Sequence, residues 1–266
     1  MTAKKPQSRS KTKSRFRQPS RSAKPELRLA GKVAVVTGGS RGIGYAIARI
    51  LAREGCAVVI TGRNGAELTR SAARIRQQAG DEARVIPITC DVRSSDAVQA
   101  LFDAVRERLG KIDVLVNNAG ISQPATPLQD TSLELWQAVI ETNLTGMFLC
   151  TRAALPLLQP GATIVNNLSA AAKQLFPQYY AYTSAKMGAL GFTLSLRGEL
   201  SPRGIRVLAL LPGATNTDIW QQIMPDAPRE HMIDVESVAQ AVLCAVLLPP
   251  NVNPSEISLD PIGGAL

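Results

Sequence analysis

A tyrosine and a lysine four residues apart, Tyr182 and Lys186, have the spacing with the clearest chemistry in this chain. On a helix such residues lie on one face, one turn apart. Tyrosine alone is a poor acid–base group at neutral pH because its pKa is near 10. An ammonium group about 5 Å away supplies roughly 3 kcal/mol at an effective dielectric of about 20, which is about two pKa units. The pair is therefore predicted to transfer protons. The alternative is an ordinary Tyr–Lys pair on the surface.

A glycine turn is the second chemical feature, and it reads Gly38-x-x-x-Gly42-x-Gly44. An apolar, β-branched run from Lys32 precedes it, and apolar residues at helical spacing follow it. A strand, a glycine turn and a helix together present backbone N–H groups and a helix N-terminus to a phosphate. The turn lacks the Gly-Lys-Ser/Thr ending of a P-loop and differs from the pattern G-x-G-x-x-G. A dinucleotide phosphate is the predicted ligand.

The same turn also matches the nucleophile elbow of serine hydrolases, G-x-S-x-G, over residues 38–42. Ser40 would then be the nucleophile and His231, the one histidine, its base, with Asp218 or Asp226 between them in the chain. No strand precedes the turn's own strand, and no HGGG-type segment is present to complete an oxyanion hole. A hydrolase is therefore the disfavoured alternative.

Strand and helix patterns alternate from Lys32 to the C-terminus, which predicts an α/β fold with a doubly wound parallel sheet of about seven strands. After the first strand–helix unit, strands are expected over Ala57–Thr61, Arg84–Thr89, Ile112–Asn117, Ala162–Ser169, Ile205–Leu211 and Glu256–Leu259. Helices are expected over Ala66–Ala79, Ser95–Leu109, Leu133–Leu157, Tyr180–Leu200 and Val235–Leu248. Pro87 predicts that its strand lies at an edge. Thr131 to Glu134 reads as a capping box for the long helix.

In such a sheet the ligand lies beyond the carboxyl ends of the strands. Small, polar and glycine residues stand at six successive expected strand ends. They are Gly38–Gly44, Arg63-Asn64, Asp91-Val92, Asn117–Gly120, Ser169 and Pro212-Gly213. Turn chemistry explains each segment separately, but six together predict one site.

These motifs, in this order and spacing, resemble the short-chain dehydrogenase/reductase family. The matching residues are Thr37-Gly38-x-x-x-Gly42-Ile43-Gly44, Asn117-Asn118-Ala119-Gly120, Asn143, Ser169, Tyr182-x-x-x-Lys186 and Pro212-Gly213-x-x-x-Thr217. The resemblance runs from about Leu29 to the last strand. It implies a Rossmann-type domain and an oxidoreductase that transfers a hydride between a nicotinamide cofactor and a small carbonyl or secondary-alcohol substrate.

The resemblance also implies roles for single residues. Tyr182 would be the acid–base group, and Ser169 would hydrogen-bond the reacting oxygen. Lys186 would lower the pKa of Tyr182 and hold the nicotinamide ribose, and Asn143 would anchor a water relay to Lys186. Asp91 would contact the adenine edge, and Thr217 the carboxamide. The implied cofactor contacts are Gly38, Ser40, Arg41, Gly42, Ile43, Gly44, Arg63, Asn64, Asp91, Val92, Asn118, Ala119, Gly120, Tyr182, Lys186, Pro212, Gly213, Thr215 and Thr217.

Three features depart from the family pattern. Leu168 replaces the first of two serines, and Thr215 stands where an apolar residue is usual. The C-terminal residues 258–266 differ from the ending of the 3-oxoacyl-carrier-protein reductases, which the chain otherwise resembles. The loop Asn216–Ile233, which contains Trp220, is expected to shape the substrate pocket, or else to pack as a plain apolar lid.

The choice of cofactor is predicted from the end of the second strand. An acid there would bind the ribose 2′-OH of NAD and repel a 2′-phosphate. The sequence instead has Thr61-Gly62-Arg63-Asn64, and Arg41 in the glycine turn can reach the same space. Two guanidinium groups suit a phosphate, so NADP(H) is the expected cofactor.

The net charge of +9 belongs to the N-terminal segment. Residues 1–28 hold ten basic residues and one acid, and the remainder has 20 of each. Residues 1–26 are therefore predicted to be a disordered basic tail before a catalytic domain over 27–266. A dinucleotide-binding sensor whose tail binds nucleic acid is an alternative, but an intact Ser169, Tyr182 and Lys186 set favours an enzyme.

The remaining composition excludes several classes of protein. No apolar run reaches the roughly 18 residues of a membrane span. Four scattered cysteines and one histidine indicate neither a disulfide framework nor a metal site, and the expected location is the cytoplasm. The expected helix Leu133–Leu157 is apolar around most of its circumference. Its second face, with that of Tyr180–Leu200, is predicted to be buried in a homodimer or homotetramer.

Overall fold

The computed structural model of the chain describes residues 1–2, 27–80 and 82–264. Seven parallel strands in the described part form one sheet, in the order β3-β2-β1-β4-β5-β6-β7. The strands are β1 (Val33–Thr37), β2 (Ala57–Gly62), β3 (Val85–Thr89), β4 (Ile112–Asn117), β5 (Leu158–Asn167), β6 (Arg206–Pro212) and β7 (Glu256–Leu259). The predicted doubly wound parallel sheet is confirmed. The strand that contains Pro87, β3, lies at an edge as expected.

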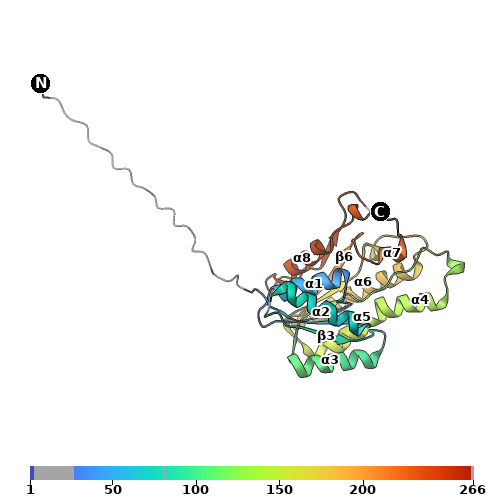
Figure 1. Ribbon diagram of the computed structural model, residues 1–266, viewed down its shortest axis with the longest axis horizontal. Helices are drawn as coiled ribbons and strands as arrows, with labels where there is room; N and C mark the ends of the chain where they lie inside the picture. Colours follow the sequence, from blue (N-terminus) through green and yellow to red (C-terminus); the bar gives the residue numbers. More distant parts are fainter. Residues whose placement is uncertain (3–26, 81, 265–266) are drawn as a thin grey trace.

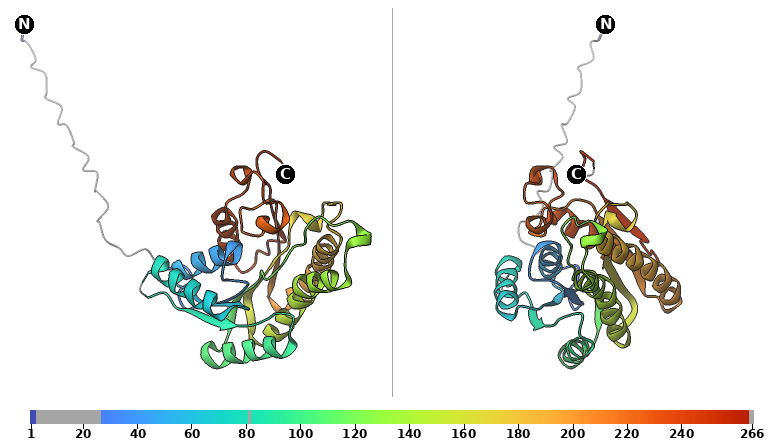
Figure 2. Two further views of the ribbon diagram at one scale, coloured as in Figure 1. Left: turned by 45° about the vertical axis from the view of Figure 1, so that its right-hand side comes forward. Right: turned by 90° about the vertical axis from the view of Figure 1, so that its right-hand side faces the viewer.

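Helices cover both faces of this sheet (Figures 1 and 2). One layer contains α1 (Gly42–Arg53), α2 (Gly65–Ala79) and α8 (Val235–Val246). The other contains α3 (Ser95–Leu109), α5 (Gly146–Ala154) and α6 (Tyr180–Leu200), and α4 (Leu133–Ile140) packs on α6. A short helix, α7 (Trp220–Ile223), lies within the loop between β6 and α8. No helix in the described ranges is both long and apolar enough to cross a bilayer.

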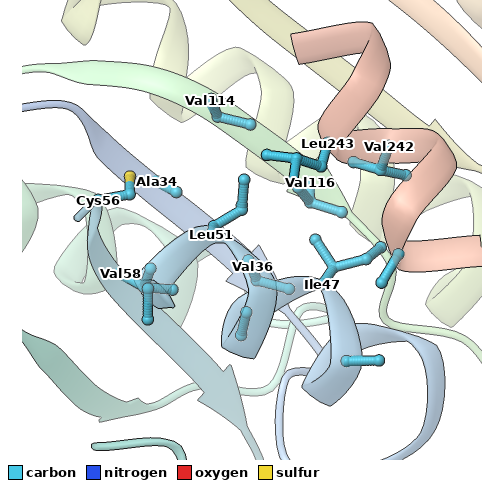
Figure 3. Packing of buried hydrophobic residues seen from close by; sticks show 14 of the residues in the cluster. Ala34, Val36, Ile47, Leu51, Cys56, Val58, Val114, Val116, Val242 and Leu243 are labelled. Atoms are coloured by element: carbon cyan, nitrogen blue, oxygen red, sulfur yellow. The ribbon is translucent and has the colours of Figure 1, made fainter. Parts of the chain in front are cut away.

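The core on the α1 side is built from β-branched strand residues and helical apolar stripes. Figure 3 shows Ile47 and Leu51 of α1 among Val36 and Val116 of the sheet, with Leu243 of α8 beside them. All five are at most 1% exposed. Burying such side chains contributes roughly 1.5–3 kcal/mol each, and this holds the strand ends of β1 and β4 in fixed register beneath the glycine turn.

The prediction of one continuous α-helix over Leu133–Leu157 is wrong. These residues form α4, then a π-helical segment over Glu141–Thr145, then α5, and a 3₁₀ turn follows over Leu155–Leu157. The π segment inserts one extra residue into the helical winding, and the apolar pattern of the sequence continues through it. A proline in the 3₁₀ turn ends the α-helical part three residues early.

Two further boundaries differ from expectation. The N-cap of α4 is Ser132, whose Oγ accepts from the Leu135 N–H at 3.2 Å, because the Thr131 hydroxyl donates to the Pro127 carbonyl instead. The predicted capping box at Thr131 is therefore wrong by one residue. Strand β5 begins earlier than expected, at Leu158, and ends at Asn167, so that Ser169 lies beyond the sheet.

Candidate active site

A cavity of about 1020 Å³ lies over the carboxyl ends of the strands. Its lining includes each residue expected to contact cofactor or substrate, with the exception of Gly44. These residues are Gly38, Ser40, Arg41, Gly42, Ile43, Arg63, Asn64, Asp91, Val92, Asn118, Ala119, Gly120, Asn143, Ser169, Tyr182, Lys186, Pro212, Gly213, Thr215 and Thr217. The volume is at the upper end of what small-molecule sites have, as a dinucleotide and a substrate together require.

The glycine turn between β1 and α1 forms one wall. Gly38 and Gly42 have positive φ angles of 63° and 57°, where a side chain would be strained. A Cβ on Gly44 would stand 2.4 Å from the Gly38 carbonyl oxygen, so Gly44 supports the turn from below and does not line the cavity. The N-cap residue Arg41 places no side chain on the first N–H groups of α1, which leaves them available to a phosphate.

Asn118 fixes this turn to the neighbouring strands. Its Nδ2 donates to the carbonyls of Thr37 and Gly38 at 2.9 and 3.0 Å, and its Oδ1 accepts from Asn167 Nδ2 at 2.8 Å. The Thr37 hydroxyl accepts from the backbone N–H groups of Asn118 and Ala119. The ends of β1, β4 and β5 are thus joined by side-chain hydrogen bonds just beneath the cavity.

Tyr182 and Lys186 lie side by side on α6, as their spacing predicts. Lys186 Nζ is 5.5 Å from the centre of the Tyr182 ring and donates to the Asn167 carbonyl at 3.1 Å. Only 5% of Lys186 is exposed, and burial lowers its pKa to about 8. Tyr182 belongs to a small apolar cluster with Val139 and Ala185. The alternative of an exposed surface pair is therefore excluded.

The expected lowering of the Tyr182 pKa by Lys186 is wrong for this structure. Burial raises the pKa of the Tyr182 phenol above its ordinary value, and hydrogen bonding with Ser169 opposes that rise. The ammonium lies over the face of the ring, and desolvation of the phenolate is the larger effect.

Ser169 and Asn143 complete the group around Tyr182. The Ser169 Oγ accepts from the Ala171 N–H at 3.1 Å and so orients its hydroxyl. Leu168, which replaces the first serine of the family pattern, is 2% exposed and packs in an apolar cluster. Asn143, in the π segment, donates from Nδ2 to the carbonyls of Ile121 and Val139, both at 2.9 Å. Its buried Oδ1 has no hydrogen-bond partner among the residues that the structure describes, so it can accept one further hydrogen bond.

The opposite end of the cavity carries two arginines, Arg41 and Arg63, beside two acids, Glu67 and Asp91. Arg41 and Arg63 are exposed there, and neither forms a salt bridge with an acid of the described ranges. Asp91 is held by Arg93 through a hydrogen-bonded ion pair at 2.6 Å, which keeps the pKa of its carboxyl below the usual value. Asn64 caps α2 by accepting from the Glu67 N–H at 3.0 Å.

Comparison with known proteins assigns the family. Residues 32–228 match the family model described as short chain dehydrogenase. The chain is 40% identical to the 3-oxoacyl-[acyl-carrier-protein] reductase of Synechocystis sp., with 73% of this chain and 78% of that protein covered. It is 42% identical to 3beta-hydroxysteroid dehydrogenase 1 of Eggerthella lenta, with 72% and 73% covered. This chain belongs to the short-chain dehydrogenase family.

Solved structures agree with this assignment. A short chain dehydrogenase from Burkholderia cenocepacia J2315, in complex with NADP, is 33% identical with a TM-score of 0.79, and the alignment covers 88% of this chain and 98% of that one. The protein is therefore a short-chain dehydrogenase: an oxidoreductase of carbonyl and alcohol substrates that uses a nicotinamide dinucleotide. The hydrolase alternative built on Ser40 and His231 is thereby excluded. His231 is exposed and does not line the cavity.

In this short-chain dehydrogenase the loop after β6 closes the cavity on the substrate side. Thr215 is buried, its hydroxyl donates to the Gly213 carbonyl, and its own carbonyl accepts from Trp220 Nε1 at 2.9 Å. Thr217 stands next to the glycine turn, because a Cβ on Gly42 would lie 3.3 Å from the Thr217 methyl group. The basic N-terminal segment expected over 1–26 lies, except for residues 1 and 2, outside the described residues.

Sequence reasoning missed several residues of the site. Gln174, Phe176 and Tyr179, in the segment between Ser169 and Tyr182, also line the cavity. Their aromatic and amide character gave no signal beyond that of an ordinary loop. A buried glutamine, Gln123, was missed as well. It does not line the cavity, but it contacts the backbone of Tyr182.

Proposed function

We propose that this short-chain dehydrogenase transfers a hydride between NADP(H) and an uncharged ketone or secondary alcohol, with Tyr182 as the acid–base group. The observation that carries the proposal is the group of buried Lys186 and half-buried Tyr182 and Ser169 at one end of a cavity whose other wall is a glycine turn. A group able to exchange a proton thus faces the same cavity as the glycine turn that would bind the dinucleotide.

Each residue has a distinct part in this proposal. Tyr182 gives its phenolic proton to the substrate oxygen during reduction and takes it back during oxidation. Ser169 hydrogen-bonds that oxygen, and Lys186 holds the ribose hydroxyls next to Tyr182. The unpartnered Oδ1 of Asn143 anchors the water through which the proton is replaced. The bound nicotinamide supplies or accepts the hydride.

NADP(H) is the proposed cofactor because of the charge at the adenosine end. Arg41 and Arg63 are free to bind a 2′-phosphate, and β2 ends without an acid that would repel it. The complex of the Burkholderia cenocepacia relative with NADP supports the same choice.

An uncharged substrate is proposed from the lining of the cavity. Its cationic residues are Arg41 and Arg63 at the adenosine end and Lys186 beside Tyr182, so the lid offers no cation to a carboxylate or phosphate. The lid contributes apolar Trp220, Ile223 and Met224 to the lining. The names of the relatives, which refer to 3-oxoacyl and 3β-hydroxysteroid groups, fit a large and largely apolar substrate.

A substrate panel with one variant tests the function. NADPH oxidation is measured with an uncharged 3-oxoacyl thioester, a 3-oxosteroid and anionic acetoacetate, and we expect turnover of an uncharged ketone. Tyr182→Phe should lower kcat by orders of magnitude and leave the Kd of NADPH nearly unchanged, because it removes only the proton donor. Tyr180→Phe is the matched control, since Tyr180 lies on the same helix outside the cavity. Near-normal turnover by Tyr182→Phe would refute the assignment.

The proposed location is the cytoplasm. Its support is that all four cysteines are unpaired, and that burial raises the pKa of Cys56 to about 12 and that of Cys90 to about 11. Cysteines without disulfide bonds are typical of a reducing compartment.

A further inference from the structure

The loop after β4 carries a buried glutamine that binds both sides of the α6 N-terminus. Gln123 is 1% exposed. Its Oε1 accepts from the Tyr182 N–H at 3.2 Å, and its Nε2 donates to the Gln178 carbonyl at 3.1 Å. We propose that Gln123 is a positioning residue that holds Tyr182 in its reactive place, an inference that rests on the proposed role of Tyr182.

Helix α6 needs such a partner because it begins without a cap of its own. The N-cap residue, Tyr179, makes no side-chain capping hydrogen bond. The backbone N–H of Thr183 already bonds within the helix, to the Tyr179 carbonyl at 2.8 Å. Tyr182, one residue earlier, has the third N–H of the helix, which an N-cap side chain ordinarily satisfies. A side chain from another element takes that place here.

The turn before α6 is also held by the same loop. Gln178 has φ = 69°, the one positive φ of a non-glycine residue in the described ranges. Such a backbone persists when surrounding contacts fix it. The Gln178 carbonyl accepts from Gln123 Nε2 and from the Thr126 N–H, both at 3.1 Å. The residues on either side of the helix start are thus bonded to one loop.

Apolar packing also attaches the loop after β4 to helix α6. Ile121, two residues before Gln123, packs against the cluster that contains Ala181, Ala185 and Tyr182. The loop continues directly from Asn118–Gly120, which lines the cavity beside the glycine turn. One continuous segment therefore positions both the proton donor, Tyr182, and the cofactor-binding wall formed with the glycine turn. A misplacement of about 1 Å between reacting groups can lower a rate by about a hundredfold.

Gln123→Met tests this inference, because methionine keeps the length of the side chain and removes both hydrogen bonds. With NADPH and either the uncharged 3-oxoacyl thioester or the 3-oxosteroid, we expect kcat to fall roughly ten- to a hundredfold. The Kd of NADPH should stay within about twofold of wild type, since the glycine turn keeps its hydrogen bonds to Asn118. Amide hydrogen exchange in residues 178–186 should accelerate, a result that needs no substrate.

The matched control is Ser94→Ala, which removes the N-cap hydrogen bond of α3 to the Ala97 N–H. No residue of α3 lines the cavity, so this variant should lose similar stability with kcat unchanged. In Gln123→Met the pH of half-maximal alcohol oxidation should also move upward, because Tyr182 loses contact with the Ser169 hydroxyl that lowers its pKa.

The possible outcomes separate the two proposals. A normal kcat and normal exchange in Gln123→Met, with Tyr182→Phe inactive, would overturn the positioning role and leave the function intact. Equal kcat losses in Gln123→Met and Ser94→Ala would show a general effect of stability and also overturn it. If Tyr182→Phe stays active, the proposed function itself fails, whatever Gln123→Met does.

Discussion

At the scale of single residues, we propose that two guanidinium groups select NADP(H) as the cofactor. Arg63 follows β2 and Arg41 lies in the glycine turn, and both are exposed to the cavity. A charge-assisted hydrogen bond contributes about 1.5–3 kcal/mol, so Arg63→Asp should weaken NADPH binding at least tenfold. NADH, which has no 2′-phosphate, should bind about as before. Fluorescence titration of both cofactors gives the four dissociation constants.

The control for this change is Arg70→Asp. Arg70 is exposed on α2 and does not line the cavity, so the variant alters net charge equally without touching the proposed phosphate site. Equal affinities of the wild type for NADPH and NADH, or unaltered NADPH binding in Arg63→Asp, would count against the NADP preference.

The loop segments that line the cavity were predictable from the sequence because each follows an apolar run, whereas Tyr182 and Lys186 were found from their helical spacing. A parallel sheet brings all such strand ends to one edge, so position along the chain translates directly into position in space. The surroundings of individual side chains were harder to predict from the sequence. The pKa of Tyr182 depends on burial by residues far away in the sequence, and Gln123 belongs to no pattern at all.

At the scale of elements, Arg206 joins β6 to the end of α8. It is 5% exposed, and its guanidinium donates to the carbonyls of Val246 and Leu248, both at 3.0 Å. The last carbonyls of a helix lack partners within it and carry partial negative charge. Arg206→Met should therefore lower the free energy of unfolding by about 2–3 kcal/mol.

Thermal unfolding measures this prediction as a drop in Tm of roughly 5–10 °C for a domain of this size. Arg203→Met, three residues earlier and exposed in a 3₁₀ turn, should change Tm by much less. Similar Tm values for the two variants would contradict the stabilising role of Arg206.

The type of each element was predictable from its hydrophobic periodicity. Its ends depended on which of several neighbouring side chains forms the capping hydrogen bond. Thr131 and Ser132 are both good capping residues, and only the fold decides that the Thr131 hydroxyl turns back to Pro127. The expected strand Ile205–Leu211 includes Arg206, but the hydrogen bonds from its guanidinium to the end of α8 depend on the fold. The π segment is invisible because the apolar pattern continues on both sides of it.

At the scale of the whole molecule, α4, α5 and α6 expose apolar side chains that a solvated surface does not need. Trp136 is 36% exposed, Phe148 42%, Met187 37% and Leu194 51%. Phe148 also contacts Phe192 of α6, edge to face. Exposed large apolar side chains on neighbouring helices are typical of an interface between subunits, and we propose that they are buried in a homodimer or homotetramer, as the sequence predicts.

Light scattering at micromolar concentration should therefore find a dimer or tetramer, and Phe148→Asp should shift it toward smaller species. The fold should survive, since the new carboxylate lies one turn from Arg152 on the same helix. Ala100→Asp, which adds the same charge on exposed α3, should leave the assembly intact. A monomeric wild type would reject the interface.

The π segment at Asn143 also restricts how the length of this chain can change during evolution. A π turn holds one residue more than an α-helical turn, so deleting one residue from Glu141–Thr145 would close the wide turn into regular α-helix. Helix α5 would then keep Met147, Cys150 and Ala154 in the core, but the wide turn that carries Asn143 would be lost. Substitutions in this segment can be tolerated one at a time, but a deletion must displace Asn143. We therefore expect homologues to vary in residue type here and to keep the length.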